Sequence, residues 1–443
     1  MEKRISHVPG NEESVQNSQE AVIGEVDQDV AMFAAFKVFG FGRIWASILS
    51  GNSGRFSLIV VAGWEAYKIS RSAFWSSIIA FCILMPVAFI GPVAGATADR
   101  INKASQMAIG QTVAMIAALL AAIFLYFGHL TLGLLVATTA GVGVGNAIQN
   151  PAWASLTPAV IGVKRMVNGG AMIRIAQQGS EFLGPAVATP LLVRFGPIPV
   201  YVLCGICYGI ASSLSVSLRK HVPRIPSTRR GVYNPLKEAL VYVFTKQRLV
   251  GALLIVVGLH CGLTMAYTGI LPKLAESNLQ GSSGIYGGLL VAVGIGAIIG
   301  AILVIIFARW LDLKFMLVLT GVVSGLSLVL LGASMDAPLA LAGAVMVGAS
   351  QSAFMALYLA LLQGTAAPEF RGRVAAFSNI LVGSTMSSFA LLWGWLTTAF
   401  PVAWVIAVPG IVFVISLGVM MIATPWLKPP KLTRIPVLGP ADL

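Results

Sequence analysis

Long apolar blocks separated by short polar stretches run through most of the chain. A block of about 20 apolar residues is long enough to cross a bilayer as an α-helix. The one long polar interruption, residues 218–248, divides the apolar segments six and six. The pattern predicts an all-α membrane protein with twelve transmembrane helices in two pseudo-symmetric six-helix bundles. We place these spans near residues 44–67, 74–96, 105–127, 131–155, 167–193, 199–217, 249–272, 284–307, 315–333, 337–361, 374–398 and 402–424.

The composition agrees with a membrane protein. Of the 443 residues, 57% are hydrophobic and only 10% are charged, whereas soluble domains carry about 25% charged residues. A chain with so few charges cannot cover a surface that faces water. The four cysteines lie inside apolar blocks, so we expect neither a disulfide framework nor a metal site, and no cofactor.

The basic residues predict the topology. Of 29 Lys and Arg residues, 23 lie in the termini and in the alternate loops on the same side of the membrane. Four lie in the other loops, and two lie within spans. Cytoplasmic loops retain Lys and Arg, so we expect both termini in the cytoplasm of a cell whose plasma membrane, a bacterial inner membrane, holds the chain.

The net charge of +13 is explained by basic loops against an anionic inner leaflet of membrane lipid. Nucleic acid is not an expected partner, because no basic segment is long enough to fold into a domain of its own. We expect a monomer, because each chain would hold a complete cavity.

Five regions follow from this division of the chain. Residues 1–43 form an acidic, disordered tail and an interfacial lead-in, and residues 44–217 form the first bundle. Residues 218–248 form a basic cytoplasmic linker, residues 249–424 the second bundle, and residues 425–443 a cytoplasmic tail.

A loop motif follows the second span, in the segment 91–103. Its characteristic positions are Gly95, Asp99, Arg100 and Lys103. The segment resembles the Gly-x-x-x-Asp-Arg-x-Gly-Arg/Lys signature of the major facilitator superfamily, with Asn102 at the second glycine. Asn tolerates a left-handed backbone, so we expect the turn to be kept. The resemblance implies that Asp99 and Arg100 latch one access state; a charged loop that only sets topology is the alternative.

Three further motifs widen the resemblance. They are Asn150-Pro151-Ala152, Gly184-Pro185-Ala186, and a second-half loop that contains Glu369, Arg371, Gly372 and Arg373. With them, roughly residues 40–425 are similar to the branch that contains the enterobactin exporter and the transmembrane secretion effectors. Gly184 and Pro185 resemble the fifth-helix antiporter motif, which implies export; a plain proline kink is the alternative.

Charged groups inside the bilayer are the strongest functional pointers, because each costs at least about 2.5 kcal/mol there. In the fifth span, polar residues recur at i, i+3, i+4 and i+7 and so share one helix face. They are Arg174, Gln177, Gln178 and Glu181. This face must point toward protein or water rather than lipid. Arg55 in the first span shares a face with Asn52 and is a candidate to pair with Glu181.

Two interpretations of this cluster stay open. One is a buried structural ion pair between helices. The other is a cavity-lining site in which Glu181 binds a proton or a cation and the arginines gate it, since a carboxylic acid in a low-dielectric site keeps its proton more readily than in water. Glu65 is a second coupling candidate or an interfacial group, and His260 is a proton relay or a histidine bonded between helices.

Four uncharged residues complete the set of candidates. Asn146 and Gln149 share a face of the fourth span, and Gln351 and Tyr358 share a face of the tenth. Such groups either bind substrate or hold helices together by hydrogen bonds.

The sequence thus predicts a secondary active transporter that works by alternating access. We expect a proton-coupled exporter of small amphipathic molecules, drug-like or siderophore-like, which the proton gradient drives without a cofactor. A flippase for lysophospholipids or other lipids and a transport-inactive sensor are the alternatives. An enzyme is not expected, because the sequence shows no convergent nucleophile or metal set.

Overall fold

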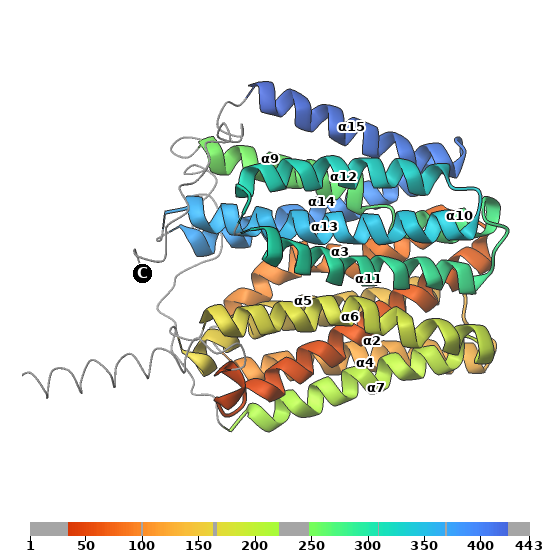
Figure 1. The fold of residues 1–443 in the computed structure, drawn as a ribbon. Coiled ribbons are helices and arrows are strands. Elements are labelled where there is room, and N and C mark those ends of the chain that lie inside the picture. Colours follow the sequence, from red (N-terminus) through yellow and green to blue (C-terminus); the bar gives the residue numbers. More distant parts are fainter. Residues whose placement is uncertain are drawn as a thin grey trace, which may run out of the picture.

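The computed structural model describes residues 34–98, 101–162, 166–220, 248–308, 310–367 and 370–423. Within these ranges every regular element is a helix, which agrees with the predicted all-α class. The helices run roughly parallel to one another along the molecule (Figure 1). A short 3₁₀ turn, Ala34–Lys37, precedes the first long helix.

The helices up to residue 218 pack mainly against one another, and we call them the first set. They are α2 (Phe41–Ser70), α3 (Ala73–Ala98), α4 (Lys103–Tyr126), α5 (Leu132–Ile161), α6 (Met166–Phe195) and α7 (Pro197–Leu218). Their bounds lie within a few residues of the predicted spans.

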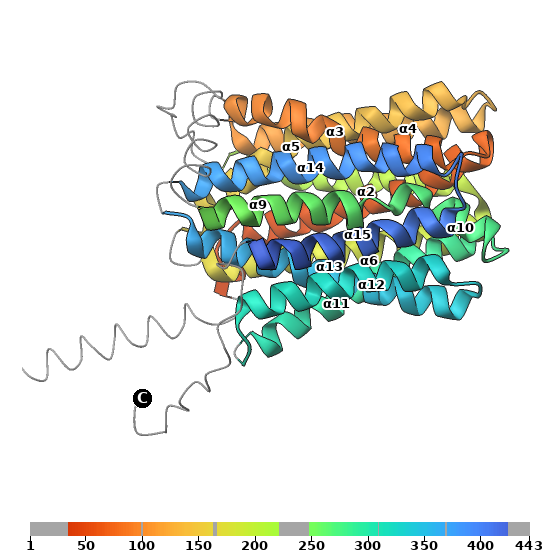
Figure 2. The same cartoon turned by 90° about the horizontal axis from the view of Figure 1, so that it is seen from above.

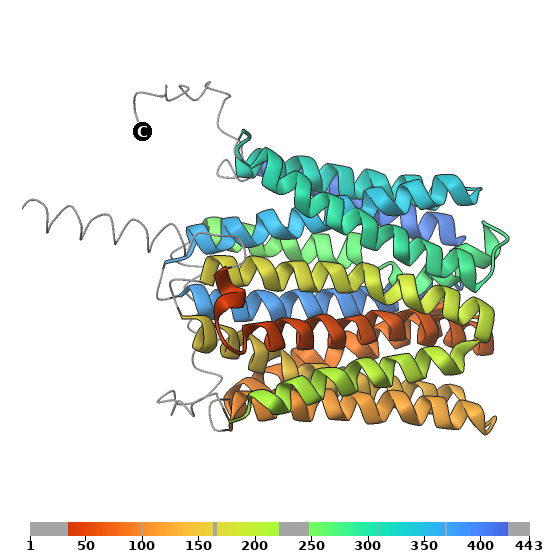
Figure 3. The same cartoon turned by 60° about the horizontal axis from the view of Figure 1, so that its bottom comes forward.

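The helices from residue 248 onward form the second set. They are α9 (Arg248–His260), α10 (Leu271–Ser277), α11 (Ser283–Phe307), α12 (Leu313–Ala333), α13 (Ala337–Thr365), α14 (Arg371–Leu396) and α15 (Val402–Ala423). In Figure 3 the first set, red to yellow-green, fills mainly the lower part of the view and the second set, green to blue, mainly the upper part, with one blue helix of the second set overlapping the first set.

The molecule has two ends along the direction of its helices. We call the end at which α2 begins and α7 ends the linker end, and the end at which α2 turns into α3 and α10 into α11 the hairpin end (Figure 1). By the predicted topology the linker end is cytoplasmic.

The seventh predicted span is present as one membrane-crossing segment, Leu249–Ser277, but its α-helix is interrupted. After α9 the chain makes a π-helical turn, Cys261–Met265, and a 3₁₀ turn, Thr268–Ile270, before α10 begins. The carbonyls that this interruption frees are bonded by side chains of other helices. Gln351 Nε2 donates to Thr264 O at 2.6 Å, and Trp393 Nε1 donates to Gly262 O at 2.9 Å. A broken helix is tolerated at membrane depth when neighbours satisfy its backbone in this way.

Asn102 also departs from its prediction. Its backbone is extended, with φ −60° and ψ 121°, and not left-handed. Its side chain instead caps α4, since Oδ1 accepts hydrogen bonds from the backbone N–H groups of Ala104 and Ser105 at 3.0 and 3.2 Å. A short polar side chain at this position satisfies free helix donors, which explains the extended backbone.

The two sets touch along two seams. In one, α6 packs against α11, and in the other α3 packs against α14 (Figure 2). Glycines bring the backbones close: a Cβ added at Gly294 of α11 would lie only 2.6 Å from the Cα of Phe182 in α6. Small residues permit such helix contacts inside a membrane, where burial of apolar surface adds no net attraction.

Among the described residues, ten helical segments are long and apolar enough to cross a membrane, with α9 to α10 counted as the one segment Leu249–Ser277. The outward side chains fit a lipid environment, since Ile422, Ile305 and Phe89 are 78%, 75% and 67% exposed. The protein is therefore a multi-pass helical membrane protein. The two 30-residue helices α2 and α6 are long enough as well, but polar residues inside them lower their hydropathy. The count of twelve spans stays a prediction.

We expect Gly294→Ala to destabilise the seam between the sets by about 1–3 kcal/mol, because the added methyl group overlaps the α6 backbone. The measurement is the Tm of the protein purified in detergent. Gly288→Ala on the same helix is the matched control, since a Cβ there meets only Leu341 Cδ2 at 3.7 Å. Equal Tm values for the two variants would contradict the close contact.

Candidate functional site

The site begins with the contact between α2 and α6, two helices that run in the same direction. Trp45 Nε1 donates to Met172 O at 2.8 Å, and Ser57 Oγ donates to Gly184 O at 3.1 Å. Both pairs are 127 residues apart. The two helices therefore keep a constant register, and Arg55 lies one residue from the level of Glu181.

At Gly184 the backbones of these helices approach closely. A Cβ there would lie 2.7 Å from Phe56 Cβ and 2.8 Å from Ser53 O. Pro185 lies inside α6, which nevertheless continues to Phe195. The Gly184-Pro185 motif therefore positions α6 against α2, whatever it contributes to the direction of transport.

Arg55 and Glu181 are electrostatic neighbours but not a contact ion pair. Their charges interact, yet among the described residues the ion pairs closer than 4.0 Å are Glu65–Lys68 and Arg71–Glu276. The Arg55 guanidinium lies 4.6 Å from the centroid of the Phe56 ring. Its Nε is buried without a hydrogen-bond partner.

The polar face of α6 contacts the second set at Gln178. Gln178 Nε2 donates to Ser352 Oγ of α13 at 2.6 Å. Arg174, one turn nearer the linker end, is exposed, and its Nη1 donates to Gln177 Oε1 at 3.5 Å.

Helix α5 adds amide groups beside α2. Gln149 Nε2 donates to Asn146 Oδ1 at 2.7 Å, and the Tyr208 hydroxyl donates to the same oxygen at 3.3 Å. The Asn146 Nδ2 group is buried without a hydrogen-bond partner.

A pocket opens between α2 and α5. It has about 200 Å³ of empty volume, including space open to solvent. Its lining residues are Ile48, Asn52, Gln149, Asn150 and Trp153. Three of the five carry amide side chains, so the pocket presents both hydrogen-bond donors and acceptors.

We use the name polar cluster for the groups that α2, α5 and α6 bring together around this pocket and along the α6 face. Its members are Asn52, Arg55, Gln149, Asn150, Arg174, Gln178 and Glu181.

Three candidates of the second set make hydrogen bonds to neighbouring helices or turns. His260 is fully buried, bonds Ser324 Oγ through Nε2 at 3.2 Å and stacks on Phe354 with ring centroids 3.8 Å apart. Gln351 bonds the π-helical turn, and the Tyr358 hydroxyl bonds Ser378 Oγ at 2.7 Å. The structure favours the interpretation that these side chains hold helices together by hydrogen bonds.

Glu65 lies apart from the polar cluster. It is ten residues beyond Arg55 on α2, about 15 Å along the helix axis. Its side chain is buried, with 4% exposure, and Oε1 lies 3.8 Å from Nζ of the exposed Lys68. An interfacial carboxylate that reaches into water would be exposed, so the burial of Glu65 favours the interpretation as a coupling candidate.

The first loop motif is described in part. A Cβ at Gly95 would lie 3.8 Å from Pro151 Cβ, and Lys103 Nζ donates to Ser155 O at 3.3 Å. Both residues thus connect to α5. Asp99 and Arg100 lie outside the described residues.

The motif of the second half is also described in part. Arg371 Nε donates to Ala366 O at 3.2 Å, and the Arg373 guanidinium lies 5.3 Å from the centroid of the Phe370 ring. Gly372 has open space around it. Glu369 lies outside the described residues.

A group of contacts that the sequence did not predict joins the sets at the hairpin end. The Tyr67 hydroxyl donates to Glu276 Oε2 at 2.5 Å, and Arg71 Nη1 donates to Glu276 Oε1 at 2.6 Å. Arg71 has a left-handed backbone, with φ 53°. We call these three residues the hairpin-end lock. The available signal was the pair of opposite charges at the ends of the first and seventh spans.

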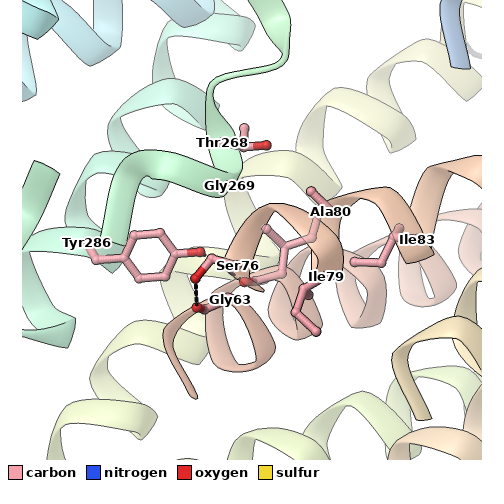
Figure 4. A pocket seen from close by; sticks show the side chains of 9 residues that line it. Gly63, Ser76, Ile79, Ala80, Ile83, Thr268, Gly269 and Tyr286 are labelled. Atoms are coloured by element: carbon pink, nitrogen blue, oxygen red, sulfur yellow. Dashed lines mark hydrogen bonds between the residues drawn. The ribbon is translucent and has the colours of Figure 1, made fainter. Parts of the chain in front are cut away.

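A small pocket lies beneath this lock, between α2, α3, α11 and the 3₁₀ turn Thr268–Ile270 (Figure 4). Tyr286 reaches across it and donates to Ile59 O at 3.0 Å, while Ser76 Oγ donates to Gly63 O at 2.9 Å. The pocket has about 220 Å³ of empty volume, including space open to solvent. Both sets line it, so it marks the seam between them.

Comparison with known families decides the identity of the fold. Residues 30–429 match the family described as transmembrane secretion effector. The chain belongs to this family of major facilitator transporters. The match spans both helix sets.

A curated relative of this transporter is the staphyloferrin A transporter of Staphylococcus aureus (strain NCTC 8325 / PS 47). It is 24% identical over 267 residues, which cover 60% of this chain and 66% of the relative, just under two thirds of its length.

Solved structures show the same fold. A POT family transporter in complex with 5-aminolevulinic acid superposes with a TM-score of 0.74 at 10% identity, covering 88% of this chain and 97% of that one. A mutant of the nucleoside transporter NupG superposes with a TM-score of 0.68 at 11% identity, covering 86% of this chain and 99% of that one.

We expect His260→Phe to cost only about 1 kcal/mol, the contribution of one hydrogen bond, and to leave the pH dependence of transport unchanged. The ring stacks among aromatic side chains, and a phenyl ring keeps that packing. The measurement is the pH profile of substrate uptake into vesicles, with the Tm as a check on folding. A displaced pH profile at an unchanged Tm would restore the proton-relay interpretation.

Proposed function

We propose that this protein is a secondary active transporter that exports small amphipathic molecules in exchange for protons by alternating access. It acts as a monomer in the bacterial plasma membrane, with both termini in the cytoplasm. The observation that carries the proposal is the position of Glu181. This carboxylate lies on the polar face of α6 that contacts the second set. Arg55 lies beside it, but the two residues do not form a contact ion pair.

The pattern of helix contacts supports twelve spans in two related bundles, here residues 44–217 and 249–424. A rotation that exchanges each span with the one six positions later carries the α3–α14 seam onto the α6–α11 seam, and both seams are present. Within the sets, the α4–α5, α3–α5 and α4–α7 contacts correspond to α12–α13, α11–α13 and α12–α15. Such a two-fold relation between halves is typical of major facilitator transporters.

In this mechanism a proton and the Arg55 guanidinium compete for the Glu181 carboxylate. When Glu181 is ionised, the Arg55 guanidinium at the same level of the neighbouring helix stabilises it; when Glu181 binds a proton, Arg55 loses that interaction. The protonated and ionised forms therefore favour different positions of α2 and α6. Movement of these helices relative to the second set then exposes the polar cluster to one side of the membrane or the other.

The contacts between the two helix sets support alternating access. Tyr67, Arg71 and Tyr286 join the sets at the hairpin end, and the contacts continue inward to Gln178 and Ser352 near the helix centres. We assign this arrangement to a state closed at the hairpin end. In the opposite state, Asp99 and Arg100 of the loop motif latch the linker end.

The first test uses everted membrane vesicles with an acid interior and a pH-sensitive dye. We expect one class among lipophilic cations, macrolides, siderophores and lysolipids to collapse the proton gradient in a protein-dependent way. Glu181→Gln should abolish this response while substrate counterflow continues, because the amide cannot carry the proton.

Glu65→Gln is the matched control for this test, since it removes a buried carboxylate outside the polar cluster. Loss of the response in Glu65→Gln alone would move the coupling site to the hairpin end. Misfolding of Glu181→Gln would indicate that the Glu181 carboxylate stabilises the fold instead of carrying the proton. No response to any compound would contradict proton-coupled export and favour lipid flipping.

Loss of the hairpin-end lock should open that end. We expect Glu276→Gln to speed labelling of a Thr268→Cys reporter by a water-soluble maleimide about two- to fivefold, the effect of an exposed ion pair worth up to about 1 kcal/mol. The reporter lines the pocket beneath the lock and is placed in a variant without the four native cysteines.

Lys68→Gln is the control for general charge effects, and the exchange Arg71→Glu with Glu276→Arg should restore slow labelling in part. Equal labelling rates in the Glu276→Gln and Lys68→Gln variants would show that the hairpin-end lock does not keep the hairpin end closed.

A further inference from the structure

Two hydroxyl groups on the seams between the sets are buried without a hydrogen-bond partner among the described residues. They are Ser77 Oγ on α3 and Thr189 Oγ1 on α6. A serine elsewhere on α6 does find a partner, since Ser180 Oγ donates to Leu49 O at 3.0 Å. The large majority of buried polar atoms in proteins are hydrogen-bonded, so the two exceptions need an explanation.

Both side chains are packed against glycines of the second set. A Cβ added at Gly394 of α14 would lie 2.6 Å from Ser77 Cβ, and one added at Gly269 would lie 2.6 Å from Ser77 Cα. A Cβ added at Gly287 of α11 would lie 2.8 Å from Thr189 Cβ. The second set therefore covers both side chains at close range, and the two hydroxyl oxygens are shielded from solvent.

These contacts lie in the half of the molecule nearer the hairpin end. Helices α3 and α11 begin at that end, and α6 and α14 end there. Ser77, Thr189, Gly287 and Gly394 each lie within about two turns of that terminus of their helix. Separation of the sets at the hairpin end would therefore expose both hydroxyl groups.

We propose that Ser77 and Thr189 set the balance between the two access states by making closure of the hairpin end costly. In the closed state each hydroxyl group has lost its water without gaining a protein partner, and a buried donor without a partner is unfavourable. In the open state both groups face the water between the sets and are hydrated again. They are positioning residues, and the inference rests on the alternating access of the proposed function.

The two hydroxyl groups oppose the hairpin-end lock. Tyr67, Arg71 and Glu276 bond the sets together at the same end and stabilise the closed state. A transporter that alternates must be able to leave each state, and a ligand shifts such an equilibrium only by the difference in its affinity for the two states. The unpartnered hydroxyl groups keep the closed state from becoming too stable to open.

The test measures opening through the Thr268→Cys reporter in the variant without native cysteines. At low reagent concentration the rate of maleimide labelling follows the fraction of molecules that are open at the hairpin end. We expect Thr189→Val to slow labelling about fivefold or more, because the methyl group that replaces the hydroxyl has no hydrogen bond to water to lose on closure. Ser77→Ala should act in the same direction on the other seam. Thr189→Ser keeps the hydroxyl and should label at close to the unchanged rate.

Thr139→Val is the matched control. Thr139 Oγ1 is also buried without a partner among the described residues, but it lies on α5, which packs mainly against helices of its own set. Its hydroxyl group stays buried in both access states, so we expect a higher Tm at an unchanged labelling rate. Thr189→Ala, with a smaller side chain, replaces Thr189→Val if a lowered Tm shows that the valine disturbs the seam.

The proposal is overturned if either Thr189→Val or Ser77→Ala labels as fast as the unchanged protein, or if Thr139→Val slows labelling as much as they do. Labelling needs neither substrate nor a proton gradient, so its outcome is separable from that of the transport test. Slower labelling of both seam variants in a protein that shows no gradient response would uphold the inference and reject proton coupling. A normal gradient response with equal labelling rates would do the reverse. A reporter that is never labelled would reject both the inference and the opening of the hairpin end.

Discussion

The parallel packing of α2 on α6 positions the polar cluster, and it depends on a backbone approach at Gly184. Any side chain there would meet Ser53 and Phe56 of α2 and push the helices apart. Because the contact is close, the register between the helices is fixed, and Arg55 comes to the level of Glu181. Charges that would each be costly in lipid are thus held between helices, where they can interact with each other and with a ligand.

The two helix sets use their polar residues differently. In the second set, Gln351 and Trp393 bond the carbonyls that the break in the seventh span leaves free. In the first set the equivalent span, α2, is one continuous helix of 30 residues. Asn52 on this helix lines the pocket between α2 and α5.

The helices themselves were predictable from the sequence. Residues 74–96 were expected as a span and α3 covers Ala73–Ala98, because the thickness of the bilayer sets the length of an apolar segment. The break after His260 was not, since its stability comes from side chains that lie about 90 and 130 residues further along the chain. Asn102 was misjudged for a similar reason: its cap geometry, and not its tolerance of a left-handed backbone, decided its conformation.

The sequence by itself determined the all-helical class, the places of the helices and the polar face of α6, since each of these depends on local periodicity and on transfer from water to lipid. The family motifs added the transporter fold. Only the tertiary structure decided which groups meet: that Arg55 interacts with Glu181 without a contact ion pair, that His260 is packed among aromatic rings, and that Glu276 binds Tyr67 and Arg71 at the hairpin end. Such pairings join residues far apart in the chain, and their geometry depends on how whole helices pack.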